Sequence, residues 1–194
     1  MSTHLLSVAA VATTLWLASP PTESQTEPPD TFDFGAQLSG AQEVVPPDAP
    51  TTPSPGVATQ TTGTLQLAVA HDLASMAFRL VVQNGVGVTA SHLHCGRAGQ
   101  NGPIVVALSA PNAEGQDVNG VLAEGTATNA NIAETASDCE ALIGRPIRNI
   151  AALTSAAAEG LIYANVHTVN NPAGELRGQV ILGFNPVTTT VPAQ

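Results

Sequence analysis

Lysine is absent from the 194-residue chain, and charged residues of any kind make up only 10% of it. Its five positive side chains, all arginine, are outnumbered by 15 acidic ones, which gives a net charge of −10. Because phosphate backbones and anionic lipids repel such a chain, we expect neither nucleic-acid binding nor binding to a membrane surface. Small cations are the partners that this charge favours, although it equally suits the solubility of a secreted protein.

Aromatic residues are also rare, at 3% of the chain, while 43% of its residues are hydrophobic. A core of small aliphatic side chains favours thin, closely packed β layers, so we expect no organic cofactor. The sequence contains no G-x-S-x-G elbow, no P-loop, no C-x-x-C pair and no paired-carboxylate cluster that can be placed in one cleft. We therefore expect a protein that is not an enzyme.

The first residues contain a charge-free run from Leu5 to Ala18, which is too short to span a bilayer comfortably. Its length matches the hydrophobic region of a signal peptide, and the small residues Ala18 and Ser19 resemble the end of one. We predict a signal peptide over residues 1–19 and a secreted or periplasmic protein. An uncleaved N-terminal anchor is the alternative.

The remaining chain divides into three parts by composition. We predict that residues 20–31 are a linker rich in Pro, Thr and Glu, that residues 32–184 are the folded domain, and that residues 185–194 are a flexible tail. Within the domain, the proline-rich segment 44–56 must be a loop, because proline is not accommodated in a central strand.

Short β-like runs alternate with turn clusters through the domain. The predicted strands are residues 35–40, 63–70, 75–83, 90–95, 103–109, 119–128, 161–169 and 174–182. Residues 147–160 are rich in Ala, carry apolar residues at helical spacing and end in Gly160, which predicts one short helix. The fold class is therefore all-β, a Greek-key sandwich or barrel with one helix.

Strand alternation places unusual polar residues together, because residues two apart share a face. His92 and His94 share one face of their strand. The polar faces of the last two strands carry Tyr163, Asn165 and His167 on one strand and Glu175, Arg177 and Gln179 on the other.

Two histidines at positions i and i+2 can converge on one metal ion, and a third from a neighbouring strand would leave an open coordination position. This hypothesis requires the segment of His92 and His94 to lie close to that of His167. The alternative is that all three are ordinary outward residues, hydrogen-bonded to Asn165, Glu175 or Gln179.

Cys95 and Cys139 are the only cysteines. In an exported domain an even count indicates a disulfide, and closing a loop of roughly 44 residues contributes about 3 to 4 kcal/mol in the chain-entropy model. The competing interpretation makes Cys95 a soft metal ligand beside the histidines.

Three segments of the chain resemble the CHRD domain, the module first described in chordin: GAQLSGAQEVVPP (35–47), SHLHCGRAGQNGPIVVAL (91–108) and LIYANVHTVNNPAGELRGQV (161–180). The run from Tyr163 to Gln179, with NVHT, NPAGE and RGQ in order, is the most specific part. The resemblance implies an extracytoplasmic β-sandwich. It matches His92 and His94 to the paired histidines of the family and His167 to the histidine of its NVHT motif.

The layout is also similar to the copper-ligand arrangement of copper–zinc superoxide dismutase, although this chain lacks a zinc-binding loop and an obvious fourth histidine. Together with the resemblance, this predicts a metal at His92, His94 and His167, with copper first and zinc second. Asn165, Glu175 and Gln179 would orient the rings as outer-shell groups, and Arg177 would pair with Glu175 or line the open position.

Three functions remain at this point. The first is an exported metal-binding protein, and the second is an extracellular interaction or adhesion module that binds a protein partner without metal. The third, an enzyme resembling superoxide dismutase, is disfavoured because the net charge of −10 repels an anionic substrate.

Overall fold

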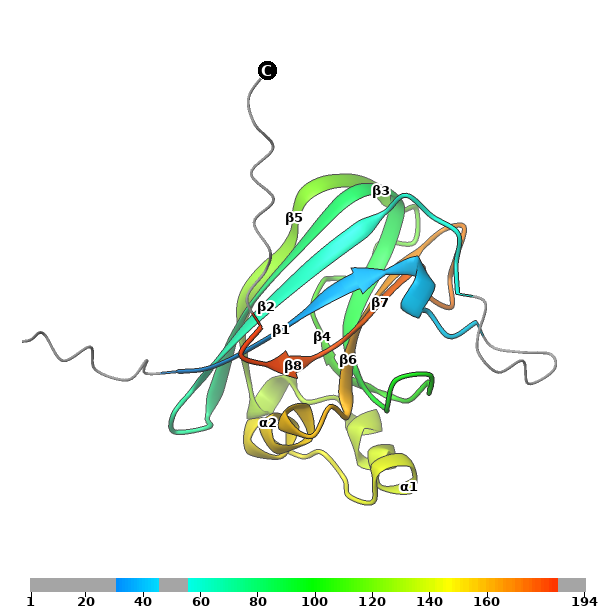
Figure 1. Ribbon diagram of the computed structural model, residues 1–194. Helices are drawn as coiled ribbons and strands as arrows, with labels where there is room; N and C mark the ends of the chain where they lie inside the picture. The colour runs from blue at the N-terminus through cyan, green and yellow to red at the C-terminus, as the bar shows by residue number, and fades with distance from the viewer. Residues whose placement is uncertain (1–30, 46–55, 185–194) are drawn as a thin grey trace, which may run out of the picture.

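Figure 1 shows the chain as a computed structural model that describes residues 31–45 and 56–184. The predicted signal peptide, the C-terminal tail, nearly all of the linker and most of the proline-rich loop lie outside these residues.

The described residues contain eight strands and two α-helices. The strands are β1 (Thr31–Ser39), β2 (Thr62–Ala70), β3 (Ser75–Cys95), β4 (Ile104–Ala107), β5 (Gln116–Thr128), β6 (Ile162–Thr168), β7 (Leu176–Gln179) and β8 (Ile181–Leu182). The helices are α1 (Cys139–Ile143) and α2 (Ile150–Ala158), and 3₁₀ turns lie at Gly40–Gln42, Asn129–Asn131 and Glu134–Asp138.

Five of the strands close into a barrel. Antiparallel pairing runs from β1 to β2, from β2 to β3, from β3 to β6 and from β6 to β7, and β7 returns to β1 through the pair Ser39 and Arg177. Side-chain alternation gives the barrel its core face: Leu65, Leu67 and Val69 of β2 are buried, while the residues between them are less buried. The predicted all-β fold class is confirmed.

The long strand β3 belongs to two halves of the structure. Its first half pairs with β2 and β5, and its second half pairs with β6 and β4. The register shifts between Val82 and Gly85 and again between Gly85 and Val88, where the strand passes from one set of partners to the other. The sequence predicted two separate strands here, residues 75–83 and 90–95, and this prediction is wrong. The structure joins them in one strand, with bulges in the segment around Gly85.

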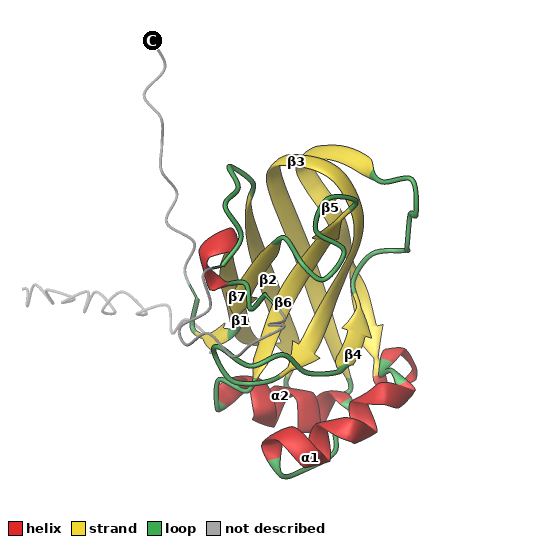
Figure 2. Cartoon of the chain, turned by 90° about the vertical axis from the view of Figure 1, so that its right-hand side faces the viewer, coloured by secondary structure: helices red, strands yellow, loops and turns green. Residues whose placement is uncertain are grey.

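Helices α1 and α2 lie together at one end of the barrel (Figure 2). Helix α2 begins later than predicted because Asn149 caps it, its side chain accepting a hydrogen bond from the backbone N–H of Ala152. Ile150 and Leu153 of α2 are buried in the core. In the described part of the chain, no helix has the length and apolar character needed to cross a membrane.

Candidate metal centre

Three neighbouring strands carry one continuous polar face. His92 of β3 is opposite Asn165 of β6, and His94 is opposite Tyr163. Asn165 is in turn opposite Arg177 of β7. Because directly opposed residues of an antiparallel pair point to the same side, these side chains lie on one face of the sheet.

The three candidate histidines meet on this face. Nδ1 of His92 lies 3.1 Å from Nε2 of His167. The ring centroid of His94 lies 5.5 Å from that of His92 and 6.2 Å from that of His167. One nitrogen from each ring can be chosen so that all three atoms lie within 4.8 Å of one another. The two chain segments that supply the rings are therefore adjacent, as a shared metal ion requires.

Backbone carbonyls fix the orientation of two of the rings. Nδ1 of His94 lies 2.9 Å from the carbonyl oxygen of Gly102, and Nδ1 of His167 lies 3.0 Å from that of Pro172. A carbonyl oxygen only accepts, so each Nδ1 carries the proton and each Nε2 presents its lone pair. Nε2 of His94 is buried and has no hydrogen-bond partner among the described residues.

Burial keeps the rings neutral. It lowers the pKa of His94 to about 4, and it lowers the pKa of His92 to about 4 with a further contribution from the neighbouring His167. The pKa of His167 is also lowered by burial. All three rings are therefore unprotonated near neutral pH, which is the form that coordinates a metal ion.

The ring of Tyr163 packs against the face of the His94 ring. The two rings are stacked, with centroids 5.0 Å apart and an angle of 9° between their planes. The guanidinium carbon of Arg177 lies 3.4 Å from the centroid of the Tyr163 ring, in a cation–π contact. Both Tyr163 and Arg177 are buried. The ring of His94 is consequently held by stacking as well as by its hydrogen bond.

Two of the four predicted outer-shell residues hold the loop that orients His94. Arg177 donates to the carbonyl oxygens of Arg97 and Gln100 and to the side chain of Asn101. Gln179 donates to the carbonyl oxygen of Gly96, at the start of the same loop, and to that of Gly160. The sequence led us to expect that Gln179 orients a histidine ring directly, but neither Gln179 nor Arg177 is hydrogen-bonded to one. Both residues instead hold the backbone of the loop whose Gly102 carbonyl orients His94.

The other two predicted outer-shell residues, Glu175 and Asn165, hold the turn whose Pro172 carbonyl orients His167. Glu175 accepts hydrogen bonds from Thr168 and from Asn171, within that turn, and also from Thr59. The pKa of Glu175 is lowered: burial raises it, but the hydrogen bonds from hydroxyl and amide groups outweigh the burial.

Asn165 acts on the same turn through Glu43. Its amide donates hydrogen bonds to the Glu43 carboxylate, at 2.5 Å, and to the carbonyl oxygen of Leu176, at 3.0 Å. Gly174 lies directly against this pair, with no room for a Cβ atom. Asn165 and Glu175 therefore support the turn and not the imidazole itself.

Sequence reasoning missed several groups at this site. Glu43 is 3% exposed, and burial raises the pKa of its carboxyl group. It lies within the segment GAQEVVPP, so the CHRD resemblance offered a signal for it. The carbonyl groups of Gly102 and Pro172 had no such signal, because every residue carries one.

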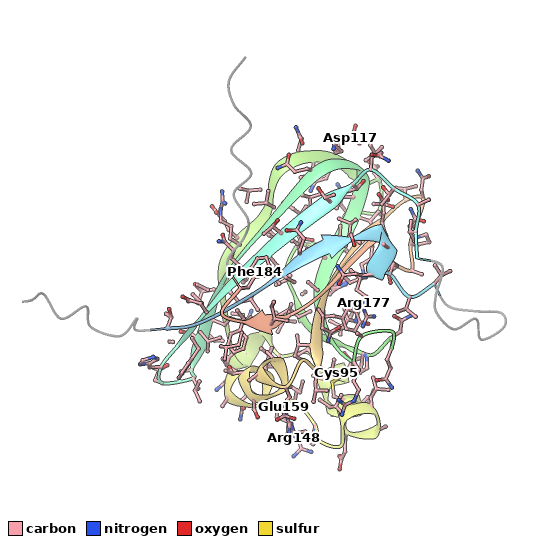
Figure 3. All side chains as sticks on the ribbon, viewed as in Figure 1. Cys95, Asp117, Arg148, Glu159, Arg177 and Phe184 are labelled. Carbon is pink, nitrogen blue, oxygen red and sulfur yellow. A yellow bond between two sulfur atoms is a disulfide. The ribbon has the colours of Figure 1, made fainter. Side chains whose placement is uncertain are left out.

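The two cysteines form a disulfide, as predicted. Cys95 and Cys139 are bonded with Cα atoms 6.0 Å apart, and both residues are fully buried. Figure 3 shows Cys95 toward the end of the barrel where α1 lies. Since its sulfur is in the disulfide, the alternative of Cys95 as a metal ligand is wrong for this form of the protein.

Comparison with known families decides the classification. A sequence model of the CHRD domain matches residues 34–180. The chain belongs to the CHRD domain family. No curated protein and no solved structure matches it. The matched part of the CHRD domain contains all three clustered histidines and both cysteines. A CHRD domain is an extracellular type of domain, and the disulfide agrees with an oxidising environment.

Proposed function

We propose that this CHRD-domain protein is exported and binds one transition metal ion through His92, His94 and His167. The observation that carries the proposal is the orientation of the rings: the Nδ1–H groups of His94 and His167 donate to backbone carbonyl oxygens, which leaves their Nε2 atoms to bind a metal ion. Metal-ligating histidines in proteins are commonly oriented by such a hydrogen bond from the other ring nitrogen.

The separations within the cluster suit a metal ion. Two nitrogen ligands with bonds of about 2.0 to 2.1 Å to one ion lie about 2.9 to 3.4 Å apart at common coordination angles. The atoms of His92 and His167 are already 3.1 Å apart. His94 brings the third nitrogen within 4.8 Å of the others, so a small side-chain movement would complete the set.

The ligand chemistry favours copper, with zinc as the second choice. Imidazole binds both metals, and copper stands highest in the stability order of the divalent ions. The net charge of −10 raises the local concentration of cations around the protein. Copper bound by three imidazoles would supply an open coordination position, while the protein supplies neutral, oriented nitrogen atoms.

Metal titration of the full chain tests the proposal. We expect one equivalent of Cu(II) or Zn(II) to bind, and the changes His92→Ala, His94→Ala and His167→Ala each to weaken binding by at least about 100-fold. The matched control is His71→Ala, which removes an exposed histidine outside the cluster and should leave binding unchanged. Absence of binding at micromolar metal, or binding that survives all three cluster changes, overturns the proposal.

We propose a binding role in preference to a superoxide dismutase activity. The acidic charge of the chain would slow the approach of an anionic substrate. If the copper-loaded protein removes superoxide faster than the same concentration of free copper, an enzymatic role replaces this one. If the protein binds no metal but retains a protein partner, the interaction-module alternative replaces it.

A further inference from the structure

The disulfide lies beside the candidate metal centre, since Cys95 directly follows His94 in β3. We infer that the Cys95–Cys139 disulfide positions the ring of His94, so that metal affinity depends on the redox state of the two cysteines. The affinity part of this inference rests on the proposed metal-binding function.

The disulfide holds α1 against the barrel. Cys139 is the first residue of this five-residue helix, and the bond to Cys95 ties the helix to the end of β3. So short a helix has little stability of its own. The position of α1 against the barrel therefore depends on the disulfide and on the packing of its apolar side chains.

Helix α1 in turn packs against Gly102. A Cβ atom at Gly102 would lie 2.7 Å from Cδ2 of Leu142, in α1, and only 1.8 Å from the carbonyl oxygen of Cys95. Gly102 is therefore enclosed between the backbone of a disulfide residue and a side chain of the helix that the disulfide holds. Any displacement of α1 removes one side of this enclosure.

Gly102 is hydrogen-bonded to the ring of His94. The N–H of Gly102 donates to the hydroxyl oxygen of Tyr163 at 3.1 Å, and its carbonyl oxygen accepts from Nδ1 of His94 at 2.9 Å. The next carbonyl, of Pro103, accepts from the N–H of Cys95 at 3.2 Å. The carbonyl oxygen that sets the tautomer of His94 is thus fixed by the segment that the disulfide and α1 hold in place.

Reduction would release this arrangement. A dithiol reductant transfers two electrons and two protons to the disulfide, which becomes two thiols while the dithiol becomes a cyclic disulfide. Because Cys95 and Cys139 are both 0% exposed, the reaction requires α1 to open first. The ring of His94 then loses its fixed acceptor, and outer-shell losses of this kind typically weaken metal binding by 10- to 100-fold.

The experiment compares three variants of the full chain. Cys95→Ala with Cys139→Ala removes the disulfide, Leu142→Ala keeps the disulfide but removes the side chain against Gly102, and Leu153→Ala is a matched control for a lost core side chain in α2. Zn(II), which is redox-inert, is titrated against a chromophoric chelator. We expect affinity to fall about tenfold or more in the first variant, less in the second, and not in the control.

A second measurement needs no metal. In the metal-free wild-type chain the Nδ1–H proton of His94 is hydrogen-bonded and buried, so we expect a resolved downfield proton resonance in NMR spectra. The resonance should disappear through solvent exchange in the disulfide-free variant and persist in Leu153→Ala. If the disulfide-free variant does not fold, the same two measurements on Leu142→Ala, the ring-proton resonance and the Zn(II) affinity, test the inference in its place.

The two proposals fail in different ways. A folded disulfide-free variant that keeps the ring proton and binds Zn(II) within twofold of the wild type overturns this inference and leaves the metal site standing. A wild-type chain that binds neither Zn(II) nor Cu(II) overturns the metal site and the affinity dependence with it. The ring proton then decides whether the disulfide positions His94.

Discussion

His92 and His167 are 75 residues apart in the chain, yet Nδ1 of the first lies 3.1 Å from Nε2 of the second. Since Nδ1–H of His167 donates to the carbonyl oxygen of Pro172, the hydrogen between the two rings belongs to His92. A metal ion would take the place of that hydrogen. The contact therefore links the chemistry of the site directly to the protonation of its rings.

The first prediction concerns the pH dependence of stability in the metal-free protein. The pKa of His94 is about 4 in the folded chain and 6.5 in its ordinary state, so between these values the unfolded chain binds a proton that the folded chain does not. The free energy of unfolding should fall as the pH drops from about 6.5 to about 4, by about 3 kcal/mol at most for this ring. Urea unfolding at a series of pH values measures it.

The variant His94→Gln separates this effect from that of the carboxylates. It should show a smaller decrease between pH 6.5 and 4 than the wild type, whereas His71→Gln, at an exposed position, should keep the full decrease. A wild-type curve that is flat over this range would show that the buried rings are not held neutral.

The second prediction concerns Gly174, in the turn that orients His167. Its φ is +139°, and an added Cβ would lie 2.6 Å from both the Asn165 amide and the Glu43 carboxylate. Gly174→Ala should therefore cost about 2 kcal/mol or more and weaken metal binding about tenfold. Thermal unfolding and metal titration measure the two effects.

The control for Gly174 is Gly120→Ala. Gly120 of β5 also has a positive φ, of +144°, but an added Cβ would meet no atom within 4 Å. This change introduces backbone strain alone, which should cost about 1 kcal/mol and leave metal affinity unchanged. Equal effects of the two substitutions would argue against steric pressure on the turn.

The third prediction concerns Glu43. Its carboxylate accepts from the Asn165 amide and from the backbone N–H of Val44, and the residue is buried. Glu43→Ala should destabilise the domain by about 2 kcal/mol, because it removes an acceptor from buried donors. Glu43→Gln, which keeps one acceptor oxygen, should cost about half as much. If denaturant unfolding gives equal stabilities for the wild type and both Glu43 variants, the hydrogen bond between Glu43 and Asn165 does not stabilise the fold.

The sequence was informative wherever side-chain alternation decided the outcome. The period of two along the strands was sufficient to group His92 with His94 and to separate both from Cys95, and the buried Leu93 follows the same rule. The CHRD resemblance, together with the similar ligand layout of copper–zinc superoxide dismutase, supplied the expectation that the two histidine segments lie together, which periodicity alone cannot provide.

The sequence was uninformative wherever the backbone decided the outcome. Side chains were the expected partners of the rings, but His94 and His167 donate to the backbone carbonyls of Gly102 and Pro172. Every residue has such a carbonyl, so the residue type does not indicate which one accepts. Likewise the sequence predicted two strands, residues 75–83 and 90–95, where the structure has the single strand β3. Whether a glycine ends a strand or forms a bulge depends on the neighbouring strands, which are remote in sequence.

The last prediction concerns Arg177, which is 1% exposed. Its guanidinium donates to Asn101, Arg97 and Gln100 and lies over the ring of Tyr163. Lysine keeps the charge but lacks the planar fork, so it cannot serve three acceptors and stack at once. Arg177→Lys should therefore destabilise the protein by about 2 to 4 kcal/mol, measured by urea unfolding, and should increase amide hydrogen exchange at Gly102.

The matched control is Arg79→Lys. Arg79 pairs with Glu124 on the surface, where both side chains are at least half exposed, and the change should cost less than about 0.5 kcal/mol. Faster exchange at Gly102 in Arg177→Lys but not in Arg79→Lys would show that Arg177 holds the loop that orients His94. If Arg177→Lys lowers stability without changing exchange at Gly102, the arginine contributes to the core alone, and the ring of His94 depends on Tyr163 and the disulfide for its position.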